Sequence, residues 1–548
     1  MLLTIINSIF VGDVVLEKEV FIRKASGLVR PYGALDVTLI YTLIIFAILN
    51  TTLQLAWFHG FWPGADLPIG CLVGLIPTLL VAFAYWAIAV SMPRSGCDYV
   101  WFARVTHPAI GFGWSLVYFY MYLCAAFVTI CFTYGYTISM ALVAWGMLYN
   151  APNLVSIGTW LQSTTGSFVF ALVIMIIYCI LNILGYKIAK AILYAGWIIQ
   201  AIALIAMWYI LGSITPTTFA AKWDSLMSNY VTYDGVFKLS ESAGWSFTPI
   251  SFGPTFSSVA FTFMLLSGAA FGAGTISGEV RDVSKSVPIG LILSNLFSCA
   301  IWSICDITLL HATSYKWFSA ISWLWASGSA EYPLPFPPSM PLMIGIAAYP
   351  NTSIGLLALT TFVLANIAFP YVTLMTAARY WFAWGFDRLM PTKLAEVSTR
   401  FKTPHYAIIV TTIIAIISGF LFAFLGFANW FAAVSTVMVL CYAVIALSVA
   451  IFPYTKWRTL LDTLPKFMRA RIAGVPAITI ISAVGAIILF YAAYAVSVNP
   501  LLTANANLAA ILFGSIFVGG IILYYIGKAY WAKKGIDITL GFKEIPPA

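Results

Sequence analysis

The chain is dominated by long apolar stretches, separated from one another by shorter polar segments. Twelve of these stretches have the length of about 20 residues with which a helix crosses the hydrocarbon core of a bilayer. They cover residues 34–57, 68–91, 109–142, 167–186, 190–213, 256–278, 288–311, 354–384, 405–427, 429–452, 475–497 and 507–530. The pattern predicts an all-α polytopic membrane protein with about twelve transmembrane helices.

Composition excludes the other broad classes of protein. Charged residues make up 8% of the chain and hydrophobic residues 62%. Soluble domains usually contain about 25% charged residues and about 45–50% apolar residues. A chain with so few charges cannot cover the surface of a soluble fold, and it is too apolar to be disordered. The net charge of +9 would suggest a nucleic-acid partner in a soluble protein, so the positions of the charges decide its meaning.

The basic residues lie almost entirely on one side of the predicted membrane. With an even number of spans, both termini share that side, which holds 24 of the 27 lysines and arginines and leaves only Lys222, Lys238 and Lys316 on the other. By the positive-inside rule this side is the cytoplasm. The charge pattern therefore predicts a multi-pass protein of the cell membrane with both termini cytoplasmic, and no nucleic-acid partner.

The spans and charges suggest a division of the chain. We expect a cytoplasmic N-terminal arm (1–33), a ten-helix core (34–452), a basic cytoplasmic loop (453–474), two further helices (475–530) and a cytoplasmic tail (531–548). The two long outer loops, 214–255 and 312–353, exceed the usual connection length and are rich in Trp and Tyr. They are either a lid or packed surface element, or anchors at the membrane surface.

Four short segments on the predicted cytoplasmic side resemble motifs of one transporter family. Residues 91–99 read S-M-P-R-S-G-C-D-Y and resemble P-x-x-G-G-x-Y, with Cys97 in place of the second glycine. Residues 278–288, which contain G-E-V-R-D-V and V-P, resemble E-E-v-k-n-P…i-P. The segment A-R…F-D-R-L-M-P at 378–391 and K-T-P at 402–404 resemble two further motifs. Together, and in this order, they resemble the amino acid–polyamine–organocation (APC) superfamily.

The resemblance implies a fold and a function. The fold has two inverted repeats, the first five helices and the next five, with the last two helices peripheral. The first and sixth helices are broken at mid-membrane, where freed N–H groups bind a substrate carboxylate and freed carbonyls bind an amine or a coupling cation. The implied function is that of a secondary active transporter, or permease, without a cofactor, that moves a small organic solute by alternating access.

The same resemblance places the candidate substrate site at the two breaks. In the first helix the substrate-binding candidates are Ala47, Ile48, Leu49, Asn50 and Thr51, and in the sixth they are Ser267, Gly268, Ala269, Ala270, Phe271 and Gly272. The glycines of the sixth helix favour an unwound segment, although close helix packing is the alternative. The first helix has no glycine in this stretch, and its polar residues either support a break or bond back to the helix.

Three residues are candidates for coupling to an ion, and Na⁺ and H⁺ both remain open as partners. Gln200 stands where some branches of the family carry a lysine, and a neutral amide cannot release a proton in its place. Thr373 and Thr376 lie one turn apart and offer hydroxyl oxygens to a cation, or else bond back to their own helix. No Cys/His spacing indicates a metal site.

Ionisable residues inside the spans are few, which bears on the solute. Asp306 is expected near the outer end of its helix, within reach of water, so the middle of the membrane holds no carboxylate for a polyamine. We therefore expect a neutral or zwitterionic amino acid or a related amine. Glu279 and Asp282 lie beside Arg281 and Lys285, which predicts a local ion-pair cluster.

The alternatives are an integral-membrane enzyme and a channel. An enzyme would need clustered carboxylates or histidines at an interface. The cytoplasmic segments offer only isolated carboxylates such as Asp98, Asp387 and Asp462. Transport is therefore the favoured interpretation, and the chain is not expected to be an enzyme.

Overall fold

The computed structural model describes residues 27–425, 434–498 and 506–545. This part of the chain is almost entirely helical and contains eleven helices long and apolar enough to span a membrane, or twelve if the bent pair α2 and α3 counts as one span. The prediction of an all-α polytopic membrane protein with about twelve spans is confirmed. The only strands among the described residues are the short antiparallel pair β1 (Arg471–Ile472) and β2 (Val475–Pro476).

The first half of the bundle contains five spans. They are α2 (Ala34–Ile45) with α3 (Ile48–Phe61), α4 (Leu67–Ser91), α6 (Pro108–Tyr118) continued by a π-helical turn (Phe119–Cys124) and α7 (Ala125–Leu148), α9 (Thr164–Ile183), and α10 (Tyr186–Gly212). The short helices α5 (Cys97–Val105) and α8 (Pro152–Gln162) lie between spans.

The second half begins with another interrupted span. Its members are α14 (Val259–Leu266) with α15 (Ala269–Ile276), α16 (Val283–Thr313), α19 (Thr352–Leu364) continued by α20 (Ala368–Phe386), α21 (His405–Phe424), α23 (Val434–Ile451), α25 (Ala477–Val498) and α26 (Ala506–Ala532). The predicted junction of the ninth and tenth spans at 427–429 lies outside the described residues. So does most of the predicted N-terminal arm, and the division into domains stays a prediction.

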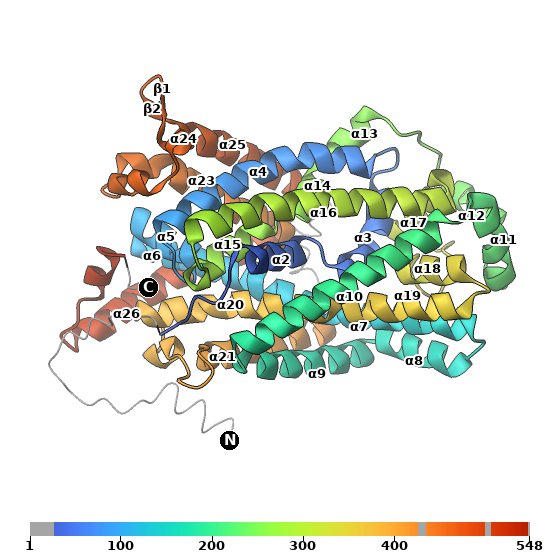
Figure 1. Ribbon diagram of the computed structural model, residues 1–548, viewed down its shortest axis with the longest axis horizontal. Coiled ribbons are helices and arrows are strands. Elements are labelled where there is room, and N and C mark those ends of the chain that lie inside the picture. Colours follow the sequence, from blue (N-terminus) through green and yellow to red (C-terminus); the bar gives the residue numbers. More distant parts are fainter. Residues whose placement is uncertain (1–26, 426–433, 499–505, 546–548) are drawn as a thin grey trace.

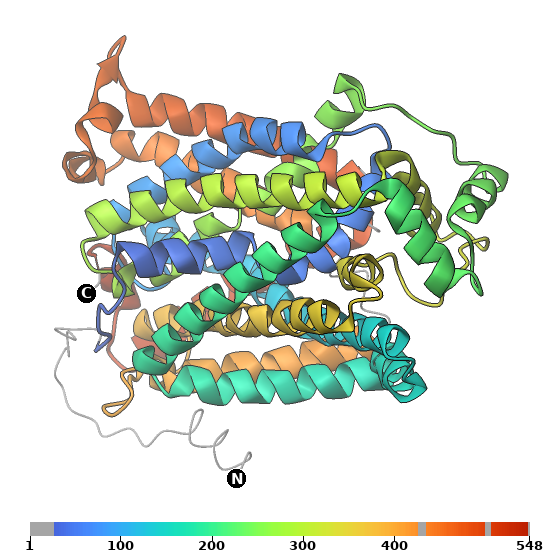
Figure 2. The same ribbon diagram turned by 45° about the vertical axis from the view of Figure 1, so that its right-hand side comes forward.

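The spans run side by side along the long axis of the molecule, and α2 lies at the centre of the bundle (Figures 1 and 2). It packs against α15, α16 and α20. Its buried face includes Val37, Tyr41 and Leu43, each with no exposed surface. Outer helices instead present apolar side chains outward, such as Ile198 and Ile205 of α10, which are more than 60% exposed. Apolar side chains on the outer surface suit a bundle surrounded by lipid, because contact with hydrocarbon does not penalise exposed apolar groups.

The two long outer loops are folded. The first contains α11 (Pro216–Met227), α12 (Tyr233–Ser242) and α13 (Phe252–Ser257), and the second contains α17 (Tyr315–Ala326) and α18 (Met340–Ala348). Trp223 and Trp317 are fully buried with ring centroids 4.7 Å apart, and Tyr233 stacks on Trp317 at 5.0 Å. Of the two alternatives open from the sequence, the packed surface element is therefore the one formed.

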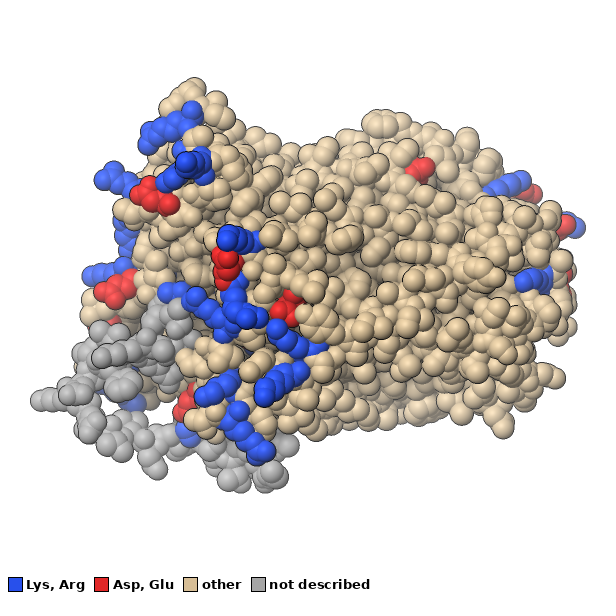
Figure 3. All heavy atoms as spheres, in the orientation of Figure 1, with Lys and Arg blue, Asp and Glu red and all other residues tan. Residues whose placement is uncertain are grey.

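Charged side chains gather at one end of the bundle. Figure 3 shows lysines and arginines concentrated at the end that carries α5, the β1–β2 hairpin and the C-terminal part of α26, while few lie at the opposite end with α11 and α12. We call these two ends the basic end and the opposite end. The middle of the visible face carries almost no charge, as expected for a surface in contact with hydrocarbon.

Candidate functional site

The first span is broken near its middle. α2 ends at Ile45 and α3 begins at Ile48, with an angle of 46° between them. Phe46 and Ala47 are extended, with φ/ψ of −123/101° and −105/141°. A break was predicted near Ala47–Asn50, and it falls at Phe46 and Ala47, whereas Asn50 and Thr51 lie within α3. A helix that begins inside a membrane leaves its first N–H groups without partners in the helix, and Ala47 adds no side-chain cap.

The sixth span is interrupted more gently. Ser267 and Gly268 separate α14 from α15, yet both keep helical dihedral angles. The N–H groups of Ala270 and Phe271 donate three residues back, to Ser267 and Gly268, at 3.3 and 3.2 Å. The expected unwinding over Ser267–Gly272 is therefore wrong in extent, because Ala269–Gly272 form the first turn of α15. The interruption is a two-residue change in hydrogen bonding, which glycine and a small polar residue tolerate.

The two interruptions lie against each other. A Cβ atom on Gly268 would lie 3.1 Å from both the Cγ2 atom and the carbonyl oxygen of Ile44, the penultimate residue of α2. A Cβ atom on Gly272 would lie 2.7 Å from the Tyr41 ring. The absence of side chains at these positions lets α15 lie directly on α2. Close packing, the alternative weighed for these glycines, is what joins the two broken spans.

Apolar and aromatic side chains surround the breaks. Ala47 packs with Tyr134 of α7 and Phe369 of α20. Phe46 meets Trp302 of α16 edge-on at 5.1 Å, and Phe271 meets Tyr122 edge-on at 5.7 Å.

Polar groups near the breaks are hydroxyls and amides. Thr52 and Thr137 share a hydrogen bond of 2.8 Å between α3 and α7. Ser267, Thr51 and Thr52 are each 1% exposed, and Asn50 is half-buried. The predicted substrate residues on the two spans are therefore brought together, although their role in binding stays a prediction. Nothing is described for the side chains of Ile48 and Leu49.

The three coupling candidates are all buried. The Thr373 hydroxyl donates to the Phe369 carbonyl at 2.9 Å, and the Thr376 hydroxyl donates to the carbonyls of Val372 and Thr373 at 3.1 and 2.8 Å. These threonines therefore bond back to their own helix, the alternative considered from the sequence. Gln200 is fully buried on α10. A role in cation binding stays a prediction for all three.

A buried ion pair closes the basic end of the core. Arg379 of α20 donates from Nε and Nη2 to the two Glu279 oxygens at 2.7 and 2.8 Å. The sequence suggested a local cluster, but only Asp282 and Lys285 pair locally, at 3.6 Å and largely exposed. Glu279 instead reaches a residue one hundred positions away. The backbone adds to this closure, because Tyr32 and Glu279–Arg281 exchange hydrogen bonds of 3.3 and 2.7 Å.

A second buried pair lies toward the opposite end. His59 Nε2 of α3 and Asp306 Oδ1 of α16 are 2.6 Å apart, and each side chain is at most 2% exposed. Asp306 was expected within reach of water, and that expectation is wrong. The rings of Phe58, Tyr315 and Phe318 surround His59 within 5.8 Å and exclude solvent from the pair. A carboxylate opposite a histidine is not visible from the sequence, because 247 residues separate the two.

Asp98 is a third buried carboxylate that sequence reasoning missed. It lies in the first turn of α5, at the basic end, and has no exposed surface. Its Oδ1 atom accepts hydrogen bonds from the Tyr380 hydroxyl at 2.7 Å and from the Tyr99 backbone N–H at 2.8 Å. Burial raises the pKa of Asp98 to about 7, although both hydrogen bonds act in the opposite direction.

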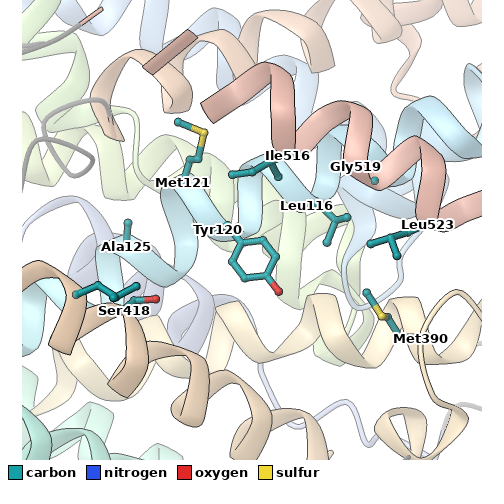
Figure 4. A pocket seen from close by; sticks show the side chains of 11 residues that line it. Leu116, Tyr120, Met121, Ala125, Met390, Ser418, Ile516, Gly519 and Leu523 are labelled. Carbon is teal, nitrogen blue, oxygen red and sulfur yellow. The ribbon is translucent and has the colours of Figure 1, made fainter. Parts of the chain in front are cut away.

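A cavity of about 370 Å³ lies in the wall of the bundle, away from the breaks (Figure 4). It is lined by the π-helical turn of the third span, by α21 and by α26, and its lining is almost wholly apolar. The Tyr120 side chain points into it, with Met121 and Ile516 beside it. None of its lining residues belongs to α2, α3, α14 or α15. An apolar recess of this kind suits a hydrocarbon chain better than a zwitterion.

Comparison with known proteins gives one finding. A family model described as amino acid permease matches residues 33–517, from the start of α2 into α26. No curated protein matches the chain.

Proposed function

The chain belongs to the amino acid permease family, and from this premise we propose that it is a secondary active transporter of a neutral or zwitterionic amino acid or a related amine. The chain is a multi-pass membrane protein of the APC superfamily, and membership in a permease family indicates transport of a small solute across a bilayer. The identity of the solute and the alternating-access mechanism are parts of the proposal.

The observation that carries the proposal is the contact between two interrupted spans at the centre of the bundle. A break frees backbone N–H and carbonyl groups, and within a bilayer such groups persist only where they are buried in protein or face a cavity. The N-terminus of α3 points partial positive charge toward the break, which suits a carboxylate. The carbonyls at the end of α2 suit an ammonium group or a cation.

The surroundings of the breaks favour a solute without net charge. Side chains near Ala47 and Phe271 are aromatic, aliphatic or hydroxylic. A solute with an unpaired positive charge would need a carboxylate there, because a bare ammonium ion in an apolar site is costly. The buried carboxylate Asp306 pairs with His59, and Asp98 lies toward the basic end. A zwitterion instead offers a carboxylate to the N-terminus of α3 and an ammonium group to the carbonyls at the end of α2.

The two buried closures support alternating access. Glu279 and Arg379 join the sixth and eighth spans on the basic end of the breaks, and His59 and Asp306 join the first and seventh spans on the other. We assign the basic end to the cytoplasm from its content of lysine and arginine, which places both termini inside the cell. Opening one closure at a time would expose the breaks to one side of the membrane only.

The test is uptake by the purified full-length protein in liposomes. The probe is an equimolar mixture of labelled neutral L-amino acids, with putrescine and spermidine as competitors. We expect uptake of at least one amino acid and little competition by the polyamines. Gly268→Leu should reduce this uptake more than tenfold, because the added side chain would push against Ile44 and separate the two breaks.

Gly514→Leu is the matched control. It makes the same substitution in α26, where a Cβ atom meets nothing within 4 Å, so uptake should stay within twofold of the unmodified protein. Equal uptake by the Gly268→Leu and Gly514→Leu proteins would place the solute elsewhere. Strong preference for a polyamine would contradict the proposed solute class, and no uptake of any solute would contradict transport itself.

A further inference from the structure

Asp98 has no exposed surface and lies at the basic end, between α5 and the helices packed on it. α5 begins after Gly96, whose φ of +69° favours glycine, and the Gly96 N–H donates to the Thr275 carbonyl at 2.8 Å. This hydrogen bond fixes the start of α5 against the end of α15. Asp98, two residues further on, is then enclosed by α4, α15, α20 and α23.

One oxygen of Asp98 has no hydrogen-bond partner among the described residues. Oδ2 is buried, and a Cβ atom built on Gly274 would lie only 2.6 Å from it. No ion pair of the described residues includes Asp98. A buried carboxylate without a cation is unfavourable when ionised, and taking up a proton removes that penalty.

The groups that face Asp98 are hydroxyls and thiols. They are Tyr380 from α20, Tyr85 from α4, Cys441 and Tyr442 from α23, and the neighbouring Cys97 on α5. Tyr99 faces Asp98 with its backbone N–H, whereas its hydroxyl donates to Asp387. Arg94, on the preceding loop, directs Nη1 to the Pro93 carbonyl. None of these hydroxyls and thiols carries a positive charge at neutral pH, so among the facing groups that the structure describes only the two hydrogen bonds to Oδ1 offset the burial of an ionised Asp98.

A group of buried tyrosines connects Asp98 with the interrupted sixth span. The ring of Tyr118 lies 5.9 Å from that of Tyr380 and 5.3 Å from that of Tyr122, and Tyr122 in turn meets Phe271 of α15. The hydroxyls of Tyr85, Tyr118 and Tyr442 lie near one another, but none forms a well-aligned hydrogen bond with a described residue. Buried hydroxyls of this kind are usually satisfied by ordered water, which conducts protons.

We propose that Asp98 is a proton-binding residue that couples solute transport to H⁺. This inference rests on the proposed function. Asp98 holds a proton while α5 is packed on α15 and the basic end is closed. When α15 moves away, water reaches the carboxyl group, its O–H bond breaks, and the proton passes to water on the basic side and leaves a carboxylate. The carboxylate is protonated again from the centre of the bundle, through the tyrosine hydroxyls and water.

The direction of release follows from the surroundings of the carboxyl group. In the closed form the pKa of Asp98 is about 7 because of burial, whereas a hydrated aspartate has a pKa of about 3.9. Opening the basic end therefore favours release of the proton that the closed form holds. Closing it over an ionised Asp98 is unfavourable, and this links closure to proton uptake.

The experiment uses the full-length protein in liposomes that contain a trapped pH-sensitive dye. The probe is the same mixture of labelled neutral L-amino acids, added outside without an imposed pH gradient, so that uptake and lumen acidification are measured together. We expect the unmodified protein to acidify the lumen as it takes up solute. Asp98→Asn should reduce the number of protons that enter per solute at least tenfold.

Asp282→Asn is the matched control, because it makes the same change in a carboxylate that is largely exposed at the same end. Tyr380→Phe is a second variant, which tests the role of Asp98 if the Asp98→Asn protein transports no solute. It removes a donor to Asp98 and should shift the pH of half-maximal acidification upward.

The outcomes separate this inference from the proposed function. A protein that takes up no amino acid contradicts the proposed function. Solute uptake without acidification, or an Asp98→Asn protein that acidifies as the unmodified one does, overturns only the role of Asp98. If Asp98→Asn is inactive and Tyr380→Phe leaves the pH profile unchanged, the role of Asp98 is overturned as well.

Discussion

Two carboxylates are buried on opposite sides of the helix breaks, and their hydrogen-bond partners differ in kind. Asp306 faces an imidazole nitrogen at 2.6 Å, whereas Asp98 accepts hydrogen bonds from one hydroxyl and one backbone N–H and forms no ion pair with any residue that the structure describes. We call His59 and Asp306 the outer pair and Asp98 the inner acid. In the outer pair the imidazole gives the carboxylate a hydrogen-bond partner in the absence of water. The inner acid can avoid an uncompensated charge only by binding a proton. An aspartate is therefore suited to a structural contact in the outer pair and to proton binding as the inner acid.

The largest expected effect comes from breaking the outer pair. His59→Leu would leave the Asp306 carboxylate buried without its partner, and we expect a loss of about 3–5 kcal/mol in stability. The double variant His59→Leu/Asp306→Leu removes both groups and should recover most of that loss, because a buried pair can often be replaced by apolar residues. Apparent melting temperatures in detergent measure both. Equal destabilisation by the single and double variants would show that the pair does not act as a unit.

The next effect is the dependence of stability on pH that the inner acid confers. Between pH about 4 and about 7 the folded protein keeps a proton on Asp98 that the unfolded chain releases, so stability falls as pH rises through this window. Asp98→Asn removes this contribution. From pH 5 to pH 8 the unmodified protein should lose about 2–3 kcal/mol relative to the variant.

The comparison is made by measuring melting temperatures of both proteins across that range. Parallel curves would show that Asp98 does not change its protonation between pH 5 and pH 8. The stability experiment needs no solute, so it tests the inner acid independently of transport.

Much of the architecture could be predicted from the sequence, because the physics behind it is local. A run of about 20 apolar residues must form a helix in lipid, since no water is present to satisfy the backbone. The spans and the sidedness of the charges follow from such rules, whereas the break near Ala47 was predicted from the family resemblance. The interruption at Ser267 and Gly268 was predicted too, although its extent was not, because a glycine does not show whether its helix unwinds or packs closely.

The candidate site was harder to predict because it depends on pairs distant in sequence. Asp306 was expected near water, yet a histidine 247 residues earlier is buried with it. Glu279 was assigned to neighbouring basic residues but pairs with Arg379. Asp98 was named only as an isolated carboxylate of the cytoplasmic segments, although the sequence held one signal of burial: it lies between Cys97 and Tyr99 in the otherwise apolar first turns of α5. Such partners are specified by tertiary packing, which a single sequence does not display.

A smaller effect should come from the hydroxyl that faces the inner acid. Tyr380→Phe removes a hydrogen bond of 2.7 Å to Asp98 but leaves the packing of the ring in place. The loss of a donor destabilises the carboxylate more than the neutral acid. A hydrogen bond contributes about 1 kcal/mol, so the midpoint of the pH-dependent stability curve should rise by about 0.5–1 pH unit. A downward shift of the midpoint would mean that the hydroxyl does not donate to the carboxylate.

The smallest effect is expected where a carboxylate at the same end is not buried. Asp282 lies 3.6 Å from Lys285, with the two side chains 53% and 79% exposed. Water and salt screen such a pair, so Asp282→Asn should change stability by no more than about 0.5 kcal/mol and leave its pH dependence unaltered. The comparison with Asp98→Asn matters because both variants remove one carboxylate from the basic end. If both variants change the pH dependence of stability alike, net charge at the basic end determines that dependence. If only Asp98→Asn changes the pH dependence, the burial of the carboxylate determines it.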